Sequence, residues 1–350
     1  MIHRVQAKPA DVAPRRWLKR PEGSNWGDFG DDDQIGRLNL ITPERRLAAM
    51  GEVRTGIAFT LSLPLDYPGG ALQPPFREPP RFSPTLGEFN VAVGSIFNAI
   101  DAPDLGNDDS VKLSTQYSTQ WDSLAHIGSR FDADGDGVAE SVYYNGYRAG
   151  HDIISCDGEG NSNARALGID KMAVGGVQGR AVLVNFHKIY GEQKVLVGYE
   201  QMMSALESQK AVVEPGDFLC LYTGFGDMVL SMKKSPDVGR LHASFVDLDG
   251  HDERLLRWIT DSGLVAICSD SMAIEAHPLP RAAGCGDHSP LLPLHHHCLF
   301  KLGIHLGELW HLGELAAWLD AHERNRFLLT APPLRLPGAV GSPVTPIGTV

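Results

Sequence analysis

Three apolar runs in the second half of the chain constrain its fold most. Residues 180–186, 217–225 and 264–270 are almost continuously apolar, and helix-like patterns lie between them at 199–210 and 252–262. Continuous apolar strands are typical of parallel sheets that are covered on both faces. Strands that alternate with helices predict parallel strand–helix–strand units. We therefore expect an α/β fold.

Further elements are expected on either side of this region. Alternating polarity and β-branched residues favour strands at 57–65, 89–97 and 111–119. Helices are expected at 43–53 and at 312–323, and in the second of these the apolar residues form one stripe. No linker rich in proline, glycine and serine divides the chain, so we expect a single main domain.

Composition narrows the classes of partner. The chain has 350 residues and a formal net charge of −12, which argues against nucleic acid and anionic membranes as partners. It has no run of 18 apolar residues that would predict a transmembrane helix. The N-terminus is basic but has no apolar centre, so we do not expect a secretory signal. We expect the protein to be cytoplasmic. We expect a small-molecule substrate.

The stretch QYSTQWDSLAH, residues 116–126, gathers groups that can hold a metal or move a proton. Gln116, Gln120, Asp122 and His126 follow one another at regular spacing. Carboxylate and carboxamide oxygens and imidazole nitrogens are all metal ligands. The ordinary alternative is that the two glutamines only pair their amides across neighbouring strands.

A second stretch is rich in histidine. Six of the 14 histidines fall between residues 285 and 311, and histidine is both a common metal ligand and a proton shuttle near neutral pH. Glu308 follows in the strand-like stretch KLGIHLGELW. A carboxylate buried in such apolar surroundings is costly unless it has a partner, and a metal ion would remove that cost.

Residues 132–140, DADGDGVAE, begin like a calcium-binding loop. An EF-hand needs a bidentate glutamate at loop position 12, where this chain has Tyr143. We therefore predict a hairpin turn at this point, with its glycines supplying the turn geometry.

Several segments resemble the cyclase family of metal-dependent hydrolases, which includes kynurenine formamidases, isatin hydrolases and trans-dienelactone hydrolases. WGDFGDDDQIGRLNLITPE, residues 26–44, is similar to the N-terminal signature of that family. Further similar blocks lie at 179–186, 219–225, 267–280 and 333–347. The resemblance implies a domain of the swivelling β/β/α type at 26–350, preceded by an N-terminal extension at 1–25.

The resemblance also assigns roles to residues. The metal-binding motif of the family is H-x-G-T-H-x-D-x-P-x-H, and it aligns with residues 116–126. Asp122 then stands at the position of a metal ligand and His126 at that of the acid–base group. Gln116 and Gln120 replace the two ligand histidines.

The second half of the family site is a histidine followed twelve residues later by a glutamate. His296 and Glu308 have this spacing, with His295 and His297 as near-register alternatives. One or two divalent ions are implied. The ion would be zinc or manganese. Because glutamine oxygens are harder donors than imidazole nitrogens, three outcomes stay open: one ion in place of two, a preference for manganese over zinc, or loss of the metal.

The implied activity is hydrolysis of a small cyclic or aryl amide or lactone by metal-activated water. Such an enzyme would be arylformamidase-like and act on a C–N or ester bond, with Trp121 and Tyr117 lining the substrate pocket. The family resemblance also implies a homo-oligomer, a dimer or a tetramer. Two alternatives stay open: a metal-free cyclase or lyase that uses His126, and a non-catalytic binding module with a degenerate metal site.

Overall fold

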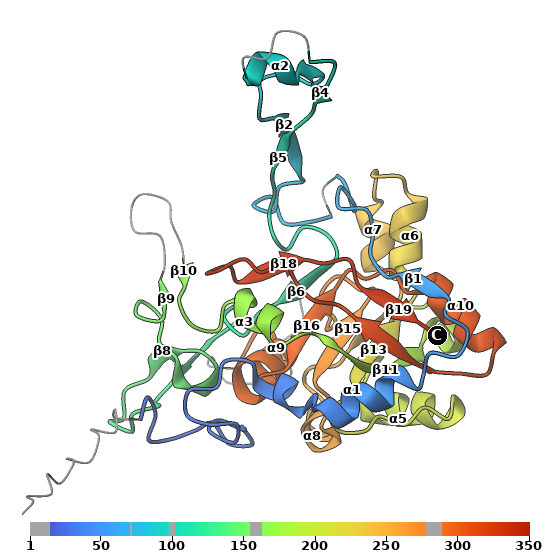
Figure 1. Ribbon diagram of the computed structural model, residues 1–350. Coiled ribbons are helices and arrows are strands. Elements are labelled where there is room, and N and C mark those ends of the chain that lie inside the picture. Colours follow the sequence, from blue (N-terminus) through green and yellow to red (C-terminus); the bar gives the residue numbers. More distant parts are fainter. Residues whose placement is uncertain (1–14, 71, 98–101, 155–162, 277–288) are drawn as a thin grey trace, which may run out of the picture.

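The structure is a computed structural model that describes residues 15–70, 72–97, 102–154, 163–276 and 289–350. It confirms an α/β fold built on one mixed sheet of nine strands (Figure 1). Across the sheet the strands are β1 (Ala58–Thr60), β19 (Ile347–Thr349), β17 (Arg326–Thr330), β11 (Gln178–Asn185), β13 (Phe218–Tyr222), β15 (Ala266–Ser269), β16 (His305–Glu308), β6 (Gln120–Asp122) and β18 (Gly341–Pro343).

The middle of the sheet is parallel, as the apolar runs predicted. Strands β11, β13, β15 and β16 run in one direction, and the strands on either side of them are antiparallel to their neighbours. Val182 and Val184 of β11 pack into one core, whereas Ala181 and Leu183 pack into the other. Because both faces are covered, these strands need apolar residues at every position.

Helices cover both faces of the sheet. Side chains of α5 (Tyr199–Ser208) and α8 (Glu253–Ser262) belong to the first core, and those of α3 (Ile169–Val174) and α10 (Gly313–Ala321) belong to the second. The predicted helices at 43–53, 199–210, 252–262 and 312–323 are confirmed; the first is α1 (Pro43–Met50), where Thr42 caps the helix by accepting the amide of Arg45.

A projecting segment replaces two of the expected strands. The predicted strand at 89–97 is wrong: only β3 (Val91–Ala92) is extended, and α2 (Val93–Ile96) follows it. The run at 111–119 contributes only the end of β5 (Asp109–Lys112). The alternation there reflects a narrow ribbon that meets solvent, not a strand that rests on the core.

This segment, residues 79–112, is called the arm and is described at 79–97 and 102–112. Strand β2 (Arg81–Pro84) pairs with β5 in the stalk, and β3 pairs with β4 (Leu105–Gly106) near the tip. Figure 1 shows the arm standing away from the rest of the molecule.

The predicted hairpin after residue 131 is confirmed. Strands β7 (Ser129–Phe131) and β8 (Glu140–Val142) pair antiparallel, with the DADGDG turn between them. The remaining elements are short: η1 (Gly36–Leu40), η2 (Tyr144–Gly146), β9 (Ile153–Ile154), β10 (Asn163–Ala164), α4 (His187–Tyr190), β12 (Val195–Val197), α6 (Phe225–Ser231), α7 (Val238–His242), β14 (Val246–Leu248), α9 (Pro293–His295) and the π-helix η3 (His296–Leu302). Among the described residues, no helix is long and apolar enough to cross a membrane.

Candidate metal centre

Two antiparallel strands bring the two sequence motifs together. Glu308 of β16 lies directly opposite Gln120 of β6, and Leu306 lies opposite Asp122. Alternate residues of a strand point to the same face, so Gln120 and Asp122 share the face that Glu308 also uses. All three side chains are buried.

The polar atoms of this cluster are incompletely satisfied. Gln120 donates from Nε2 to Oε2 of Glu308 at 2.8 Å. Four further oxygens are buried and accept no hydrogen bond from the described residues: Gln120 Oε1, both carboxylate oxygens of Asp122, and Glu308 Oε1. Unsatisfied buried acceptors of this kind are rare, and carboxylates among them are costly without a cation.

His295 completes the cluster from the end of α9. One ligand atom each from Asp122, His295 and Glu308 lies within 4.8 Å of the others, and Nε2 of His295 is 3.2 Å from Oε1 of Glu308. Glu275 fixes the ring from behind: its Oε1 is 2.6 Å from Nδ1 of His295 and also accepts the His295 backbone amide. A carboxylate that holds one ring nitrogen of a histidine directs the other nitrogen toward a metal.

The expected position of His296 in this cluster is wrong, because the neighbouring residue His295, one of the near-register alternatives, lies there instead. Nε2 of His296 lies 3.2 Å from Oγ of Ser129, and its ring packs on Phe300. His297 pairs with Thr260 at 2.9 Å. Consecutive residues of a helix point about 100° apart, so only one of three adjacent histidines can face the carboxylates. The π-helix that starts here alters the turn and hides the register from spacing.

His126 lies at the mouth of the centre. Its Nε2 is 3.9 Å from Oδ2 of Asp122, and its ring is partly exposed whereas Asp122 is buried. A pocket of about 400 Å³ reaches His126 from outside and is lined by Phe76, Arg77, Leu113, Ser114, Thr115, Gln116, His126 and Val340. The imidazole therefore separates a solvent-accessible pocket from the buried carboxylates.

The remaining predicted residues fall into different places. Gln116 lines the pocket, with Nε2 at 3.4 Å from Nδ1 of His126, so it lies beside the acid–base candidate and not beside Glu308. Trp121 points to the opposite face of the sheet, where it packs edge-on against Trp310 and donates to the carbonyl of Ala331. It does not line the pocket, which corrects its expected contact with substrate.

Tyr117 is also buried away from this pocket. Its backbone carbonyl accepts a hydrogen bond from Gln73, and its side chain is almost fully covered. Residue 117 lies in the bend that precedes β6, so the alternation of a strand does not decide where its side chain points. Its predicted role in substrate binding is therefore not supported by its position.

Burial and charge together set the ionisation of the centre. Burial raises the pKa of Asp122, an effect that nearby His126 partly offsets and that Glu308 reinforces. Burial alone would lower the pKa of His295, but the adjacent carboxylates of Glu275 and Glu308 outweigh this and raise it to about 10. The carboxylates thus attract positive charge strongly.

The donor set fits a divalent cation. Two carboxylates, one imidazole nitrogen and one carboxamide oxygen can converge from three elements, and the imidazole is already oriented by Glu275. Mixed oxygen and nitrogen donors with two negative charges suit ions such as manganese or zinc. Asp122, His295 and Glu308 would hold the ion, and Gln120 Oε1 offers a fourth oxygen.

The sequence itself matches a family model across more than half of the chain. Residues 59–276 match the model described as "Putative cyclase". This chain belongs to the cyclase family. The motif in β6 and most of the predicted α/β region lie within the matched part.

Solved structures agree with this membership. A crystal structure described as a novel cyclase is 32% identical, covers 93% of this chain and 97% of its own, and has a TM-score of 0.73. Isatin hydrolase A from Labrenzia aggregata, bound to benzyl benzoate, is 13% identical at a TM-score of 0.53, with 88% and 98% of the two chains covered. Isatin hydrolase A from Ralstonia solanacearum is 14% identical, has a TM-score of 0.52, and covers 88% of this chain and 97% of its own. At these identities the two hydrolases share the fold with this cyclase-family protein. No curated protein sequence gives a significant match.

Sequence reasoning missed Glu275 and Arg77. Glu275 stands in the apolar stretch MAIEA, and the same signal that singled out Glu308 could have found it. Arg77 lies in a proline-rich segment and lines the pocket beside His126. Only the folded chain brings it there, since 49 positions separate the two residues.

Proposed function

We propose that this protein is a metal-dependent hydrolase that opens a small cyclic or aryl amide or lactone with water. One observation supports the proposal above all: one ligand atom each of Asp122, Glu308 and the oriented His295 lies within 4.8 Å of the others. Both carboxylate oxygens of Asp122 and Oε1 of Gln120 are also buried without a hydrogen-bond donor among the described residues. A divalent ion at this point would neutralise the carboxylates. When bound, it would polarise the substrate carbonyl and lower the pKa of a coordinated water.

His126 supplies the proton chemistry in this proposal. It takes one proton from the attacking water and returns it to the leaving nitrogen or oxygen as the C–N or C–O bond breaks. Its ring is placed for this task, since Nε2 lies 3.9 Å from Asp122 and the pocket reaches the same ring from outside. Histidine is the side chain that most often transfers protons in general acid–base catalysis.

The pocket limits the substrate. A volume of about 400 Å³ admits a small bicyclic or monocyclic compound but not a polymer. Phe76 and Val340 provide apolar surface, whereas Arg77 and Gln116 provide hydrogen-bond donors for a carbonyl or carboxylate group.

The two other candidate functions are less well supported. A metal-free lyase that uses His126 would leave His295 as the one cation, among the described residues, in contact with the buried carboxylates of Glu275 and Glu308, with Asp122 beside them. A binding module with a dead site would carry the same cost, and substitution by apolar residues would remove it. The buried carboxylates therefore favour the metal-dependent hydrolase.

The deciding experiment combines metal analysis with a substrate screen. Elemental analysis of purified protein should find one or more equivalents of a divalent transition metal. A panel of small lactones, lactams and aryl formamides should then show hydrolysis that a chelator removes and added metal restores. A protein that binds no added manganese or zinc in a calorimetric titration would refute the metal centre, whatever its activity.

A further inference from the structure

The arm exposes an unusual amount of apolar surface. Of the 20 large apolar side chains that are exposed in the described part of the chain, seven belong to the arm. They are Phe82, Leu86, Phe89, Ile96, Phe97, Leu105 and Val111. Large apolar groups scattered singly over a surface are normal, but a contiguous group on one projection marks an interaction site.

The arm does not cover this surface by itself. Its stalk is a two-stranded ribbon in which Phe82 lies opposite Val111 on one face, and both side chains are exposed. The hydrogen bonds of the described arm residues stay within the arm or reach only its base. An isolated two-stranded ribbon with open edges is marginally stable in water. A binding partner would therefore stabilise it.

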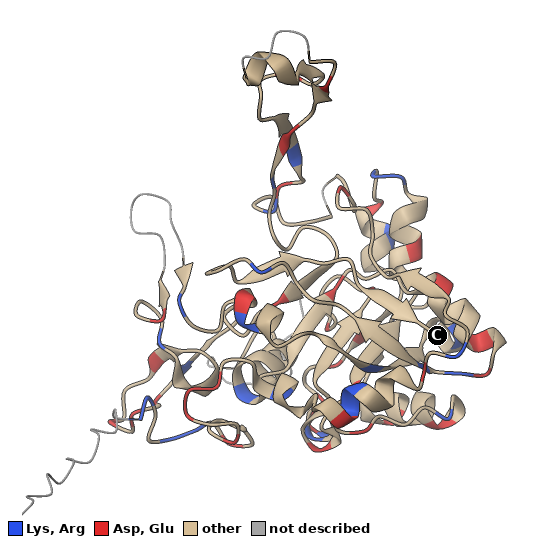
Figure 2. Cartoon of the chain, viewed as in Figure 1, with Lys and Arg blue, Asp and Glu red and all other residues tan. Residues whose placement is uncertain are grey.

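Charge narrows the choice of partner. The described arm carries four exposed acidic side chains, and none forms an ion pair with a described residue: Glu88, Asp104, Asp108 and Asp109. Its two cations, Arg81 and Lys112, lie opposite each other in the stalk. Figure 2 shows both acidic and basic residues along the arm. A surface that is both apolar and acidic suits a partner that is both apolar and basic, and anionic lipid would repel it.

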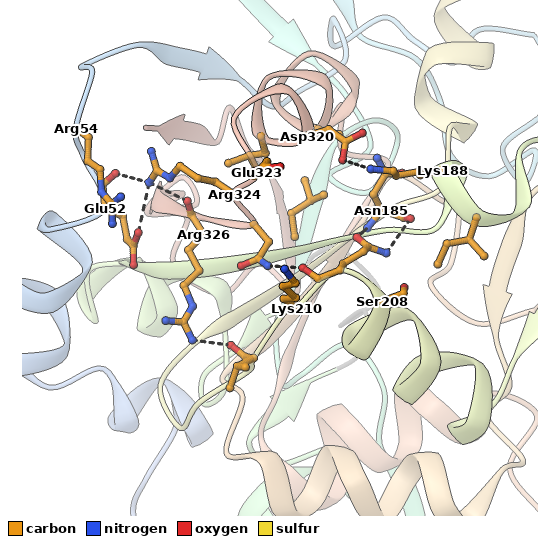
Figure 3. A pocket seen from close by; sticks show the side chains of 17 residues that line it. Glu52, Arg54, Asn185, Lys188, Ser208, Lys210, Asp320, Glu323, Arg324 and Arg326 are labelled. Carbon is orange, nitrogen blue, oxygen red and sulfur yellow. Dashed lines mark hydrogen bonds and ion pairs between the residues drawn. The ribbon is translucent and has the colours of Figure 1, made fainter.

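The same chain offers such a surface elsewhere. A cleft of about 940 Å³ lies between the ends of α5 and α10 and the start of β17. Figure 3 shows five cations around it: Arg54, Lys188, Lys210, Arg324 and Arg326. Ile189 and Val212 add exposed apolar side chains to its lining.

The positive charge of the cleft is only partly compensated. Arg324 pairs with Glu52 at 3.3 Å, Lys188 pairs with Asp320 at 2.5 Å, and Arg326 pairs with Glu214 at 3.5 Å. Glu323 also lines the cleft. Arg54 and Lys210 form no ion pair with a described residue, and both are exposed. Two cations are therefore free to meet acidic groups of a partner.

We propose that the arm of one copy binds the basic cleft of a second copy, and that two such contacts make a symmetric dimer. The proposal explains the apolar and acidic arm and the apolar and basic cleft by a single interface. Two reciprocal contacts of this kind give a dimer with closed two-fold symmetry, and closed symmetry is typical of homo-oligomers. The arm also begins next to Phe76 and Arg77, so a docked arm would hold that wall of the pocket beside His126.

Charge reversal on each side tests the contact. The arm variant carries Asp104→Lys and Asp108→Lys, and the cleft variant carries Arg54→Glu and Lys210→Glu. Light scattering should find the wild type as a dimer. Each variant alone should be a monomer, with a dimer dissociation constant raised about 100-fold or more, since like charges would then face each other.

Mixing the two variants gives the decisive result. In a mixed dimer the reversed arm meets the reversed cleft and the native arm meets the native cleft, so dimers should reappear. Lys233→Glu is the matched control, because Lys233 is also an exposed lysine with a positive φ, 48° against 51° at Lys210. It should stay dimeric, and all variants should keep the wild-type circular dichroism spectrum.

Several outcomes would overturn the proposal. The wild type could be monomeric at tens of micromolar, either variant could stay dimeric, or the mixture could stay monomeric. A monomeric wild type that sediments with phosphatidylcholine vesicles through its arm would assign the apolar surface to lipid instead.

Discussion

Gln120 distinguishes this candidate metal centre from a centre with a histidine ligand at the same position. Gln120 donates its amide hydrogen to Glu308 and keeps its carbonyl oxygen free in the same buried space. A histidine in the same place could offer a nitrogen to the metal but would not reproduce this geometry. The side chain therefore orients one carboxylate and offers an oxygen ligand at the same time.

Exchange of this residue should change the choice of metal. Gln120→His should raise the affinity for zinc relative to manganese, because zinc prefers nitrogen donors. Gln116→His is the matched comparison and should change the ratio little, since Gln116 lies beside His126. Competition titrations with both metals measure the ratio. Equal effects of the two substitutions would show that Gln120 does not face the ion.

Asp122 and His126 should separate metal binding from proton transfer. His126→Ala should keep the metal and lower turnover by roughly 10²–10⁴-fold, the usual share of general acid–base catalysis. Asp122→Asn should lose most of the metal, because it removes one of the two negative charges at the centre. Bound metal and turnover are measured on the same protein batches. Complete loss of metal in His126→Ala would make His126 a ligand.

The sequence predicted the carboxylates of this centre but not its histidine. Glu308 could be found because a charge in an apolar strand has few explanations, and Asp122 because its stretch resembles the metal-binding motif of the family. Spacing could not choose among His295, His296 and His297, because the choice depends on the phase of a helix that turns into a π-helix. Glu275 stands in an apolar stretch that could have singled it out, but its contact with the chosen ring is seen only in the folded chain.

At the scale of elements, strand β16 carries two kinds of buried polar residue on opposite faces. Glu308 faces the centre, whereas His305 lies on the other side of the strand, is almost fully buried and has no partner for Nδ1 among the described residues. Burial lowers the pKa of His305 to about 3. The strand therefore tolerates this imidazole only in its neutral form.

This burial predicts a pH dependence of stability. Between pH 6.5 and about 3 the unfolded chain binds a proton at His305 that the folded chain does not, so stability falls as the pH falls below 6.5. The contribution lost at pH 5 is about 2 kcal/mol. His305→Leu should remove it, so the difference in unfolding free energy between pH 7 and pH 5 should shrink by that amount. Urea unfolding at both pH values measures it, and an unchanged difference would show that His305 is accessible to protons.

The elements also show where pattern reasoning succeeds. Strands β11, β13 and β15 were predictable because burial on both faces leaves a continuous apolar signature. The arm was not, because its alternating residues meet solvent and only a partner would explain their apolar character. Residues 1–14 of the expected N-terminal extension lie outside the described residues, whereas residues 15–25 pack against the domain through Trp17.

At the scale of the whole molecule, the N-terminal segment supports the helix that carries the metal-site histidine. Trp26 is fully buried, packs edge-on against Phe131 and Phe300, and donates from Nε1 to the carbonyl of Phe300 at 2.8 Å. Phe300 lies in the π-helix that directly follows His295. Residues that are far apart in the chain thus meet behind the candidate centre.

Loss of this support should weaken metal binding at a distance. Trp26→Ala should lower the unfolding free energy by about 3–5 kcal/mol, through the cavity that it leaves, and should also reduce metal affinity because η3 loses a packing partner. Trp26→Phe keeps an aromatic ring and should cost about 1 kcal/mol for the lost hydrogen bond. Leu319→Ala is the control, since Leu319 is equally buried but belongs to the core on the other face of the sheet. Urea unfolding and metal titration are compared for all three proteins. If Leu319→Ala reduces metal affinity as much as Trp26→Ala does, the loss follows from general destabilisation, and Trp26 has no specific role in positioning His295.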